Sequence, residues 1–392
     1  MTVINTEKVP IFMFCENAEE GAIQQAKDVA NHPAVFRHVA IMPDTHQGYG
    51  MPIGGVCALE NAISPNMVGV DIACGMLAFK TDLNVNDFTP EELQEFLITT
   101  MRYVRKNIPM GFKHQPSLET YREQANHLLN GIRNLTDNAN YADVISGQLG
   151  TLGGGNHFVE IQKDESGNIW CMIHSGSRNI GKKTCDKYNK IALELNTKYH
   201  SPIPNKHLAF LPADSEEGQA YINHMNFCMD FSYENRKIMM AEVIRVWLMI
   251  TVKDFIVEKP INIHHNYASL EHHFGRDVWV HRKGATLARE KTVGIIPGSM
   301  GTSSYIVQGK GNEQSFCSCS HGAGRTMSRT KAKETLSLDK FGEIMKDIVF
   351  HCDKEHLDES PMAYKDIDQV MEQQKELITI KTKLTPLAVE KG

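Results

Sequence analysis

Several features that would place this chain in a specialised class of protein are missing from its sequence. No apolar run approaches the roughly 20 residues that a membrane-spanning helix needs, and the start, Met1 to Glu7, does not resemble a signal peptide. The nine cysteines include no CxxC pair, so a structural zinc knuckle is not predicted. Because their number is odd and their spacing irregular, they fit a reducing compartment, and we expect a cytoplasmic protein without a membrane partner.

Familiar nucleotide-binding motifs are missing as well. The sequence has no GxGxxG, which argues against a dinucleotide site of the Rossmann type. It also has no Lys-x-Asp-Gly, the lysine motif of classical nucleotidyl-transferring ligases. Residues 176 to 183 resemble a phosphate-binding P-loop, but Lys183 stands where that motif needs serine or threonine. If a nucleotide becomes covalently attached to this chain, a histidine is a better candidate than a lysine.

Excess positive charge is a third absence, since the formal net charge is -6. A dedicated nucleic-acid-binding domain is usually basic, so any affinity for nucleic acid must come from local clusters. One cluster comprises Arg325, Arg329, Lys331 and Lys333, and another comprises Arg178, Lys182 and Lys183. A solvated surface explains the second cluster equally well.

The remaining pattern predicts one compact domain of mixed α and β structure over residues 1–392. The sequence shows no internal repeat, low-complexity tract or linker, and 41% of its residues are hydrophobic, enough for a large core. Thr89-Pro90-Glu91-Glu92 is a capping box that predicts a helix to about Lys106. A longer helix is predicted from about Glu216 to Phe255, with its methionines as core filler. Short apolar runs between glycine-rich turns fill much of the rest, so we expect an α+β fold whose active site lies in a central, loop-lined cleft.

The segment from residue 315 to 329 is the most suggestive stretch of the chain. It places His321 between small residues and a glycine turn, so that a bulky group can approach the ring. Arg325 and Arg329 follow at a spacing that puts them on one face if the segment after Gly324 is helical, and two guanidiniums suit phosphate. A buried structural histidine beside surface arginines explains the segment alone about as well.

Five further residues have the chemistry of metal ligands. Asp71 and Cys74 are spaced to share one side of a helical turn, His157 follows a glycine run, and His174 and His265 follow short apolar runs. A histidine at the end of a strand projects into the crevice where α/β proteins usually bind ligands. A thiolate among imidazoles and a carboxylate suits zinc, manganese, iron or cobalt, and a thiolate can bridge two ions. Each histidine taken singly reads as an ordinary core or surface residue, but five candidates gathered in such turns favour a metal site.

These residues lie in long, irregular motifs that identify a family. The chain resembles the RtcB family of RNA-splicing ligases over nearly its whole length. The matching stretches are 42–50 (MPDTHQGYG), 68–76 (VGVDIACGM), 149–160 (LGTLGGGNHFVE), 174–178 (HSGSR), 265–267 (HNY), 282–285 (RKGA), 297–301 (PGSMG), the segment 315–329, and 364–367 (YKDI).

The resemblance implies a ligase that uses GTP and two Mn²⁺ ions. Such an enzyme joins RNA ending in a 2′,3′-cyclic phosphate or 3′-phosphate to RNA with a 5′-hydroxyl, and an archease-like activating protein can be its partner. By position, His321 resembles the nucleophile that takes GMP from GTP, and Asp44 the acidic residue that orients it. Asp71, Cys74 and His157 resemble the ligands of one ion, and Cys74, His174 and His265 those of the second.

The resemblance also implies two groups of contacts around the nucleophile. The residues similar to guanylate contacts are Asn156, Glu160, Ser299, Met300, Ser304, Gly322, Ala323, Gly324, Tyr364 and Lys391. The residues similar to phosphate-facing or RNA-facing arginines are Arg178, Arg325 and Arg329.

Two departures from the family and two rival functions stand beside this prediction. Ala73 occupies a position that is more often glycine, a small change that should be tolerated, and the stretch after residues 108–111 is shorter and less basic, which leaves the identity of the RNA open. One rival is a metal-dependent RNA phosphoesterase or nuclease, which would not need His321 or Lys391. The other is a non-catalytic RNA-binding subunit, which would need neither the metal ligands nor the nucleophile.

Overall fold

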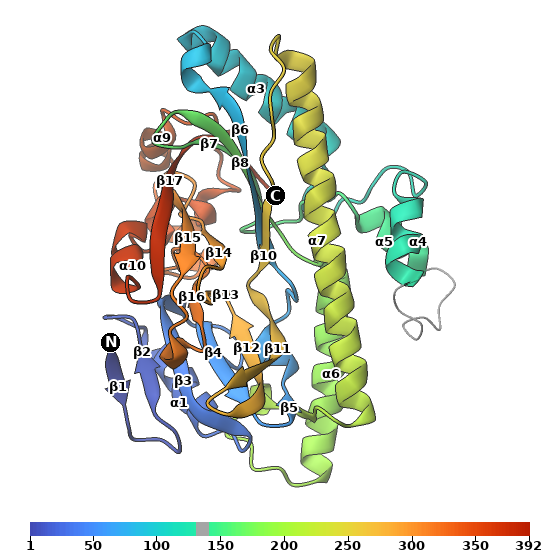
Figure 1. The fold of residues 1–392 in the computed structure, drawn as a ribbon, viewed down its shortest axis with the longest axis vertical. Coiled ribbons are helices and arrows are strands. Elements are labelled where there is room, and N and C mark those ends of the chain that lie inside the picture. The colour runs from blue at the N-terminus through green and yellow to red at the C-terminus, as the bar shows by residue number, and fades with distance from the viewer. Residues whose placement is uncertain (131–140) are drawn as a thin grey trace.

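Two large β-sheets form the centre of the computed structural model, which describes residues 1–130 and 141–392 (Figure 1). The first sheet has six strands in the order β1-β2-β3-β4-β12-β11. Only β2 and β3 run parallel among these pairs. Its strands are β1 (Thr2–Ile4), β2 (Ile11–Met13), β3 (Val35–His46), β4 (Ile53–Leu59), β11 (Asn266–His273) and β12 (Arg276–Lys283).

The second sheet has seven strands in the order β10-β6-β8-β7-β17-β15-β14, and every neighbouring pair is antiparallel. Its strands are β6 (Gly75–Asn84), β7 (Phe158–Lys163), β8 (Asn168–Ser175), β10 (Ile261–His264), β14 (Val293–Ile296), β15 (Ser304–Gly309) and β17 (Ile378–Lys391). Two small ladders pair β13 (Ala285–Leu287) with β16 (Ser318–Ser320) and β5 (Ala62–Ile63) with β9 (Leu211–Pro212).

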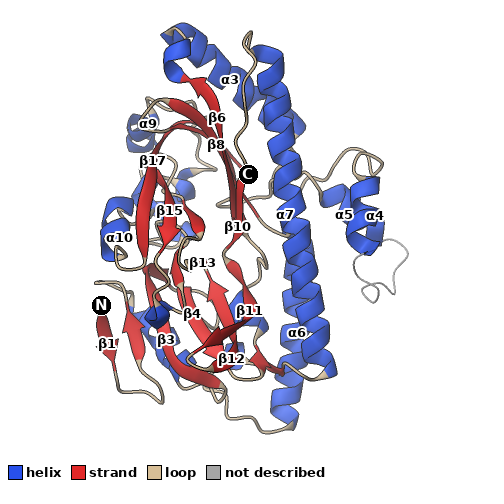
Figure 2. Cartoon of the chain, viewed as in Figure 1, coloured by secondary structure: helices blue, strands red, loops and turns tan. Residues whose placement is uncertain are grey.

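Most of the helices cover the sheets from outside, as Figure 2 shows. The long pair α6 and α7 runs along one side, while α9 and α10 lie on the other. The α-helices are α1 (Glu20–Ala30), α2 (Pro65–Val68), α3 (Pro90–Asn107), α4 (Arg122–Asn130), α5 (Tyr141–Gln148), α6 (Arg178–Lys198), α7 (Glu216–Ile250), α8 (Arg329–Thr335), α9 (Leu338–Met345) and α10 (Ile367–Gln373). Within the described residues, none of the helices combines the length and apolar character that crossing a bilayer requires. The predicted mixture of α and β structure is confirmed.

The capping box forms as predicted at the start of α3. Thr89 Oγ1 accepts from the Glu92 amide at 3.2 Å, and Glu92 Oε2 accepts from the Thr89 amide at 2.8 Å. Two of the otherwise unpaired amide groups of the first turn are thereby satisfied. The helix then buries Phe96, Leu97 and Val104 beside α7 and the second sheet.

Helix α7 ends five residues before the predicted limit of Phe255. It stops at Ile250 because Thr251 takes an extended conformation, and both the amide and the hydroxyl of Thr251 donate to the Trp247 carbonyl. Phe255 then folds back so that its ring lies 6.2 Å from that of Trp247, which supplies a hydrophobic contact beyond the helix end. The apolar run therefore continues past the helix without being helical. The predicted core role of the α7 methionines is confirmed. Met225 and Met239 are fully buried in two hydrophobic clusters, and the partly buried Met229 and Met240 pack against those clusters.

Between β10 and β11 the chain passes from the second sheet to the first within a single residue. Strand β10 of the second sheet ends at His264, and β11 of the first sheet begins at Asn266, so His265 is the junction. The same kind of break occurs at Gly284, which separates β12 from β13 with a φ of +60°. The backbone of His265 is held on both sides of the junction, since its amide donates to the Cys74 carbonyl at 2.8 Å and its carbonyl accepts from the Ala285 amide at 3.1 Å.

Candidate active site

A pocket of about 350 Å³ lies where the ends of the two sheets meet. Strands β3, β4, β11 and β12 of the first sheet contribute to its lining, and so do β7, β8 and β17 of the second. Loops supply the remainder, so strand ends line the pocket as well as the loops that the sequence predicted. The predicted site residues that line it are Asp71, Cys74, Asn156, His174, His265, Ser299, Met300, His321, Gly322, Ala323, Gly324, Arg325, Arg329, Tyr364 and Lys391.

The turn that carries Asp71 and Cys74 connects α2 to β6. The Cys74 amide donates to the Asp71 carbonyl at 3.1 Å, so the two side chains lie on one side of the turn, as their spacing predicts. Asn266 fixes this turn to β11, because its side chain donates to the Asp71 carbonyl at 3.0 Å and its own carbonyl accepts from the Ala73 amide at 2.7 Å. Ala73 has a φ of +60°, a conformation that glycine adopts without strain.

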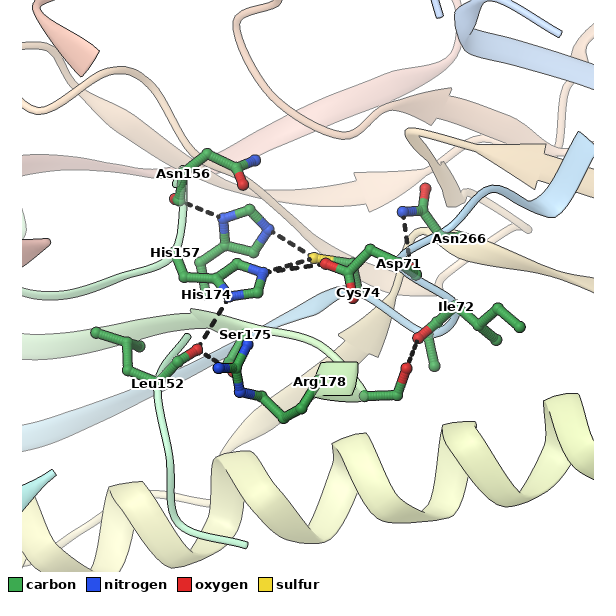
Figure 3. Close-up of polar contacts among 12 residues, drawn as sticks. Asp71, Ile72, Cys74, Leu152, Asn156, His157, His174, Ser175, Arg178 and Asn266 are labelled. Atoms are coloured by element: carbon green, nitrogen blue, oxygen red, sulfur yellow. Dashed lines mark hydrogen bonds and ion pairs between the residues drawn. The ribbon is translucent and has the colours of Figure 1, made fainter. Parts of the chain in front are cut away.

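The side chains of this turn meet His174 of β8 and His157, which directly precedes β7 (Figure 3). Cys74 Sγ lies 3.4 Å from His157 Nε2 and 3.1 Å from His174 Nε2. Asp71 Oδ2 lies 3.1 Å from His157 Nε2, and His265 Nε2 lies 3.4 Å from His174 Nε2. All five predicted metal ligands are therefore neighbours, although they come from segments spread over some 200 residues of the chain.

The hydrogen bonds of the two imidazoles make this cluster a set of electron-pair donors. His157 Nδ1 donates to the Leu152 carbonyl at 2.9 Å, and His174 Nδ1 donates to the Asn156 carbonyl at 3.1 Å. In the neutral rings the Nε2 atoms then carry lone pairs, which point at the thiol and, for His157, at the carboxylate. Lone pairs facing a carboxylate repel unless a cation lies between them, so the donor set fits a metal ion.

Burial of the cluster agrees with this interpretation. Burial, with the neighbouring histidines, holds the pKa of His174 well below its usual range, and burial with His321 does the same for His265. Burial and the Asp71 charge raise the pKa of the Cys74 thiol well above its ordinary value. A thiolate there requires a positive charge beside it, which a bound divalent ion would provide.

Arg236 of α7 supports the cluster from behind and was not predicted. Its guanidinium is fully buried and donates to the Ser175 carbonyl at 2.7 Å and to Asn262 Oδ1 at 2.8 Å. Burial lowers its pKa to about 10, while the nearby Cys74 and Asp71 favour its charged form. The sequence carries no signal for this role, because Arg236 stands in the polar run Glu234-Asn235-Arg236-Lys237.

His321 lies next to the metal-type cluster and is bonded to Asp44. The His321 ring is 4.8 Å from that of His265, and His321 Nδ1 donates to Asp44 Oδ2 at 2.6 Å. The same oxygen accepts from the backbone amides of His321 at 3.1 Å and Gly322 at 3.2 Å. Burial alone would raise the pKa of Asp44, but the charge and hydrogen bond of His321 outweigh it and lower that pKa. Asp44 is therefore ionised and holds the Nδ1–H of His321, so Nε2 is the ring nitrogen that is not bonded to Asp44.

Neighbouring residues keep this pair in place. Lys365 Nζ donates to the Pro43 carbonyl at 3.0 Å and to the Thr45 carbonyl at 2.7 Å, which braces the strand on both sides of Asp44. A Cβ on Gly284 would lie 3.0 Å from His321 Cε1 and 3.1 Å from its Nδ1. Glycine at 284 therefore leaves room for the imidazole.

Three cations meet around one carboxylate on the C-terminal side of the pocket. Glu359, which the sequence did not single out, is buried and lies 3.4 Å from Arg325 and 3.0 Å from Lys391, and it also pairs with Arg329. Tyr364 donates its hydroxyl to Glu359 at 2.7 Å. Burial would raise the pKa of Glu359, but Lys391 and Arg329 lower it, so Glu359 is ionised.

The prediction that Arg325 and Arg329 share a helix face after Gly324 is wrong. Helix α8 begins only at Arg329, and Arg325 forms an isolated β-bridge with Tyr364. The intervening segment pairs with residues 363–365 instead of coiling, since the Thr326 amide donates to the Ala363 carbonyl at 2.9 Å. The two guanidiniums still converge, because both bond Glu359.

Five predicted site residues lie outside the pocket lining. Asp44 is behind His321, and His157 is beside Cys74, as described above. Glu160 is buried on β7, where burial raises its pKa to about 8, and Ser304 Oγ accepts from the Gly298 amide at 3.2 Å. Arg178 donates to Thr151 Oγ1 at 3.1 Å and to the Gly111 carbonyl at 2.8 Å. The contacts predicted for Glu160, Ser304 and Arg178 stay predictions.

Comparisons with known proteins identify the family of this chain. The sequence model of the family described as "tRNA-splicing ligase RtcB" matches residues 25–392. An RNA-splicing ligase RtcB of Escherichia coli K12 is 38% identical over 415 aligned positions, which cover 100% of this chain and 99% of the relative. A tRNA-splicing ligase RtcB of Methanococcus maripaludis is 32% identical, with 96% and 92% covered.

The chain belongs to the RtcB family. The resemblance of the motifs is thereby confirmed over nearly the whole length of the chain, and the family is one of RNA-splicing ligases. The alignment to the Escherichia coli relative is longer than the chain, so that relative of the RtcB family carries residues that are missing here. The predicted shortening after residue 111 is not located by this comparison, and residues 131–140 of that region lie outside the described part of the chain.

Lys283 belongs to an RtcB-family motif, although no role is predicted for it from the sequence. It lines the pocket and is buried, and its Nζ donates to the carbonyls of Asn66, at 3.0 Å, and Tyr49. Burial lowers its pKa to about 8. A cation therefore lies on the wall of the pocket formed by the first sheet, in addition to those that meet at Glu359.

Proposed function

We propose that this protein is a GTP-dependent ligase that joins RNA ending in a 2′,3′-cyclic phosphate or 3′-phosphate to RNA with a 5′-hydroxyl. The observation that carries the proposal is the arrangement of His321. Its Nδ1 is held by an ionised carboxylate, its ring lies beside a buried metal-type cluster, and it shares a pocket with cationic side chains. Membership of the RtcB family supports the same conclusion.

His321 is proposed to attack the α-phosphorus of GTP. Because Asp44 holds the Nδ1–H, the electron pair on Nε2 is free to form the bond to phosphorus. The bond between the α-phosphorus and pyrophosphate breaks, which leaves GMP on the histidine and pyrophosphate as the departing anion. As positive charge develops on the imidazole, the adjacent carboxylate stabilises it.

The metal cofactor of this reaction is proposed to be Mn²⁺. Asp71, Cys74 and His157 would hold one ion and Cys74, His174 and His265 a second, with the thiolate shared. When bound, the ions would offset negative charge on the triphosphate and activate the water that opens a cyclic phosphate. The chain's own contribution is to hold the Nδ1–H groups of His157 and His174 on the Leu152 and Asn156 carbonyls, so that each Nε2 faces the metal site.

Arg325, Arg329 and Lys391 are proposed to bind the GTP phosphates and guanylate. All three form ion pairs with Glu359, and Arg329 also pairs with Asp358 at 2.7 Å. A phosphate that enters must compete with these carboxylates for the guanidiniums. The predicted guanylate contacts Asn156, Ser299 and Met300 line the same pocket, so a nucleotide could reach them from His321.

In the second step, the GMP group is proposed to be transferred from His321 to the RNA 3′-phosphate. The phosphorus–nitrogen bond to His321 breaks as a phosphoanhydride to the RNA phosphate forms. The RNA 5′-hydroxyl then attacks the 3′-phosphate, GMP departs, and a phosphodiester remains. An archease-like protein is a proposed partner for activation, as the family resemblance implies.

Incubation with Mn²⁺ and GTP labelled at the α-phosphate tests this proposal. We expect a label on the protein that is stable in base and labile in acid, as expected for a phosphorus–nitrogen bond. GTP labelled at the γ-phosphate should leave no label, since pyrophosphate departs, and His321→Ala should accept none. Absence of an adduct in protein shown to contain metal would refute guanylylation and favour the metal-dependent phosphoesterase.

A further inference from the structure

Tyr49 is an exposed aromatic side chain at the mouth of the pocket. It lines the pocket, yet 69% of it is accessible to solvent. Val70, from the turn before Asp71, also lines the pocket and is 47% exposed. Most of the other lining residues are polar or small, so this edge of the pocket is apolar and open while the interior is charged.

The loop that carries Tyr49 is fixed at several points. Gln25 of α1 bonds both the amide and the carbonyl of Gly48, at 3.0 Å and 2.6 Å. Lys283 donates to the Tyr49 carbonyl, and the Tyr49 ring meets the edge of the His207 ring at 5.9 Å. A Cβ at Gly50 would lie 2.6 Å from the His207 carbonyl oxygen, so the chain approaches that segment as closely as glycine allows. Tyr49 is thus presented to solvent by a loop that is itself held.

A fixed, exposed aromatic ring beside a cationic pocket suits single-stranded nucleic acid. Arginine and lysine side chains bind the phosphates, and an aromatic ring offers a face on which a base can stack. Stacking accepts any base, which an enzyme that joins differing RNA ends requires.

We infer that Tyr49 is a stacking platform for a base at the RNA ends that the pocket joins. This inference rests on the proposed ligase function, because it assumes that the phosphate of an RNA end reaches His321. It assigns Tyr49 to RNA binding and not to the binding of GTP. The residues proposed for guanylate come from other segments: 156, 299–300, 322–324, 364 and 391.

Three variants test the assignment. Tyr49→Ala should weaken RNA binding by about tenfold or more, the range expected for loss of one stacked base, and raise the KM for RNA. Tyr49→Phe should bind RNA as tightly as the wild type does, because the aromatic ring is kept. Tyr199→Ala is the matched control, since Tyr199 is 67% exposed but does not line the pocket, and we expect no change.

Labelling of the protein with α-labelled GTP separates this inference from the proposed function. Tyr49→Ala should label as the wild type does, because that step precedes RNA binding. If the wild type itself takes no label, the proposed function fails. If Tyr49→Ala takes less label while its melting temperature is unchanged, or binds RNA as well as the wild type, the stacking assignment is overturned.

RNAs lacking one terminal base identify the stacked end. For one of the two ends, the 3′-phosphate end or the 5′-hydroxyl end, removal of the terminal base should weaken RNA binding by the wild type about tenfold. The same removal should leave RNA binding by Tyr49→Ala unchanged. Sensitivity to one end assigns the base to that end. Equal sensitivity of the wild type and Tyr49→Ala to every abasic RNA would overturn the inference, because the lost base would then have another partner.

Discussion

Lys391 Nζ lies 3.0 Å from Glu359 Oε2, and both side chains are almost completely buried. The ammonium group also lies 3.4 Å from the Asn156 carbonyl and over the Phe158 ring. Residues at a chain end usually fray, yet Lys391 is the last residue of β17 and pairs with Phe158 of β7. The end of the chain is therefore part of the pocket wall.

Removing the charge of Lys391 should abolish guanylylation and leave the fold in place. Lys391→Met keeps the aliphatic stem against Phe158 but deletes the ammonium group proposed to bind guanylate. We expect at least a hundredfold less label from α-labelled GTP and a melting temperature within a few degrees of the wild type. Deleting residues 391 and 392 should have the same effect on labelling. Normal labelling of both variants would show that the chain end takes no part in the reaction.

Cys74→Ala should weaken metal binding and both chemical steps together. The thiol contacts both His157 and His174, so its loss removes a ligand from each proposed ion. Bound Mn²⁺ per protein and the rates of labelling and sealing should fall in parallel. Cys185→Ala is a suitable control, because that thiol is also buried but lies outside the pocket lining. Full metal content in an active Cys74→Ala protein would contradict the shared thiolate.

His321→Ala should block the first step and spare the last. The imidazole is needed only to carry GMP, so this variant should fold and bind Mn²⁺ but take no label from GTP. It should still seal an RNA whose 3′-phosphate already carries GMP, because that step depends on the metal cluster and on Arg325 and Arg329. If the variant is folded and metallated but cannot seal the activated RNA, the histidine has a second role. A structural histidine would instead give an unstable protein.

Glu271 should make the fold sensitive to acid. It is buried and bonds Arg282, as well as Arg289 at 3.0 Å and His273 at 3.1 Å. Burial would raise its pKa, but the hydrogen bond of His273 and the charge of Arg282 lower it below the ordinary 4.5. Because the folded-state pKa is depressed, the stabilisation is complete above pH 4.5 and is lost as the pH falls toward the folded-state value.

Glu271→Gln tests this prediction by chemical unfolding at several pH values. At pH 7 the variant should be less stable by about 3 kcal/mol, since it leaves buried Arg282 without its charge partner. That difference should shrink as the pH falls below 4.5. Glu194→Gln is the control, because the Lys190–Glu194 pair is exposed and should contribute little at any pH. A loss for Glu271→Gln that is the same at every pH would rule out the charged pair as the cause.

Local signals in the sequence predicted some of this structure well. The capping box at Thr89 predicted the start of α3, and the strand-end position of His174 predicted where its side chain would point, because both depend on neighbours along the chain. The helix predicted directly after Gly324 is wrong, because the segment after Gly324 pairs with residues 363–365, and this tertiary contact cannot be seen in the local sequence. The roles of Arg236 and Glu359 were not predicted for the same reason. Each is defined by partners far away in the chain, and nothing in its own segment marks it.

The two-sheet arrangement also lay beyond reach of the sequence. Short apolar runs indicate strands, but they do not reveal that β17 enters between β7 and β15, or that the chain changes sheets at His265. The family motifs indicated which residues belong together. They gave no account of the carbonyls of Leu152 and Asn156 that set the histidine tautomers.

The placement of β17 has a consequence for how the protein folds. Lys391 donates to the Asn156 carbonyl although 235 positions of the chain separate the two residues. Strand β17, which ends at Lys391, pairs with β7, which begins just after Asn156. Contacts between such distant segments raise the contact order, which slows folding because long loops must close first. His157 directly precedes β7 and His174 lies on β8, so the metal-type cluster is built on the strands that this slow closure locks together. We expect refolding protein to acquire metal late, in the same kinetic phase in which the seven-stranded sheet closes.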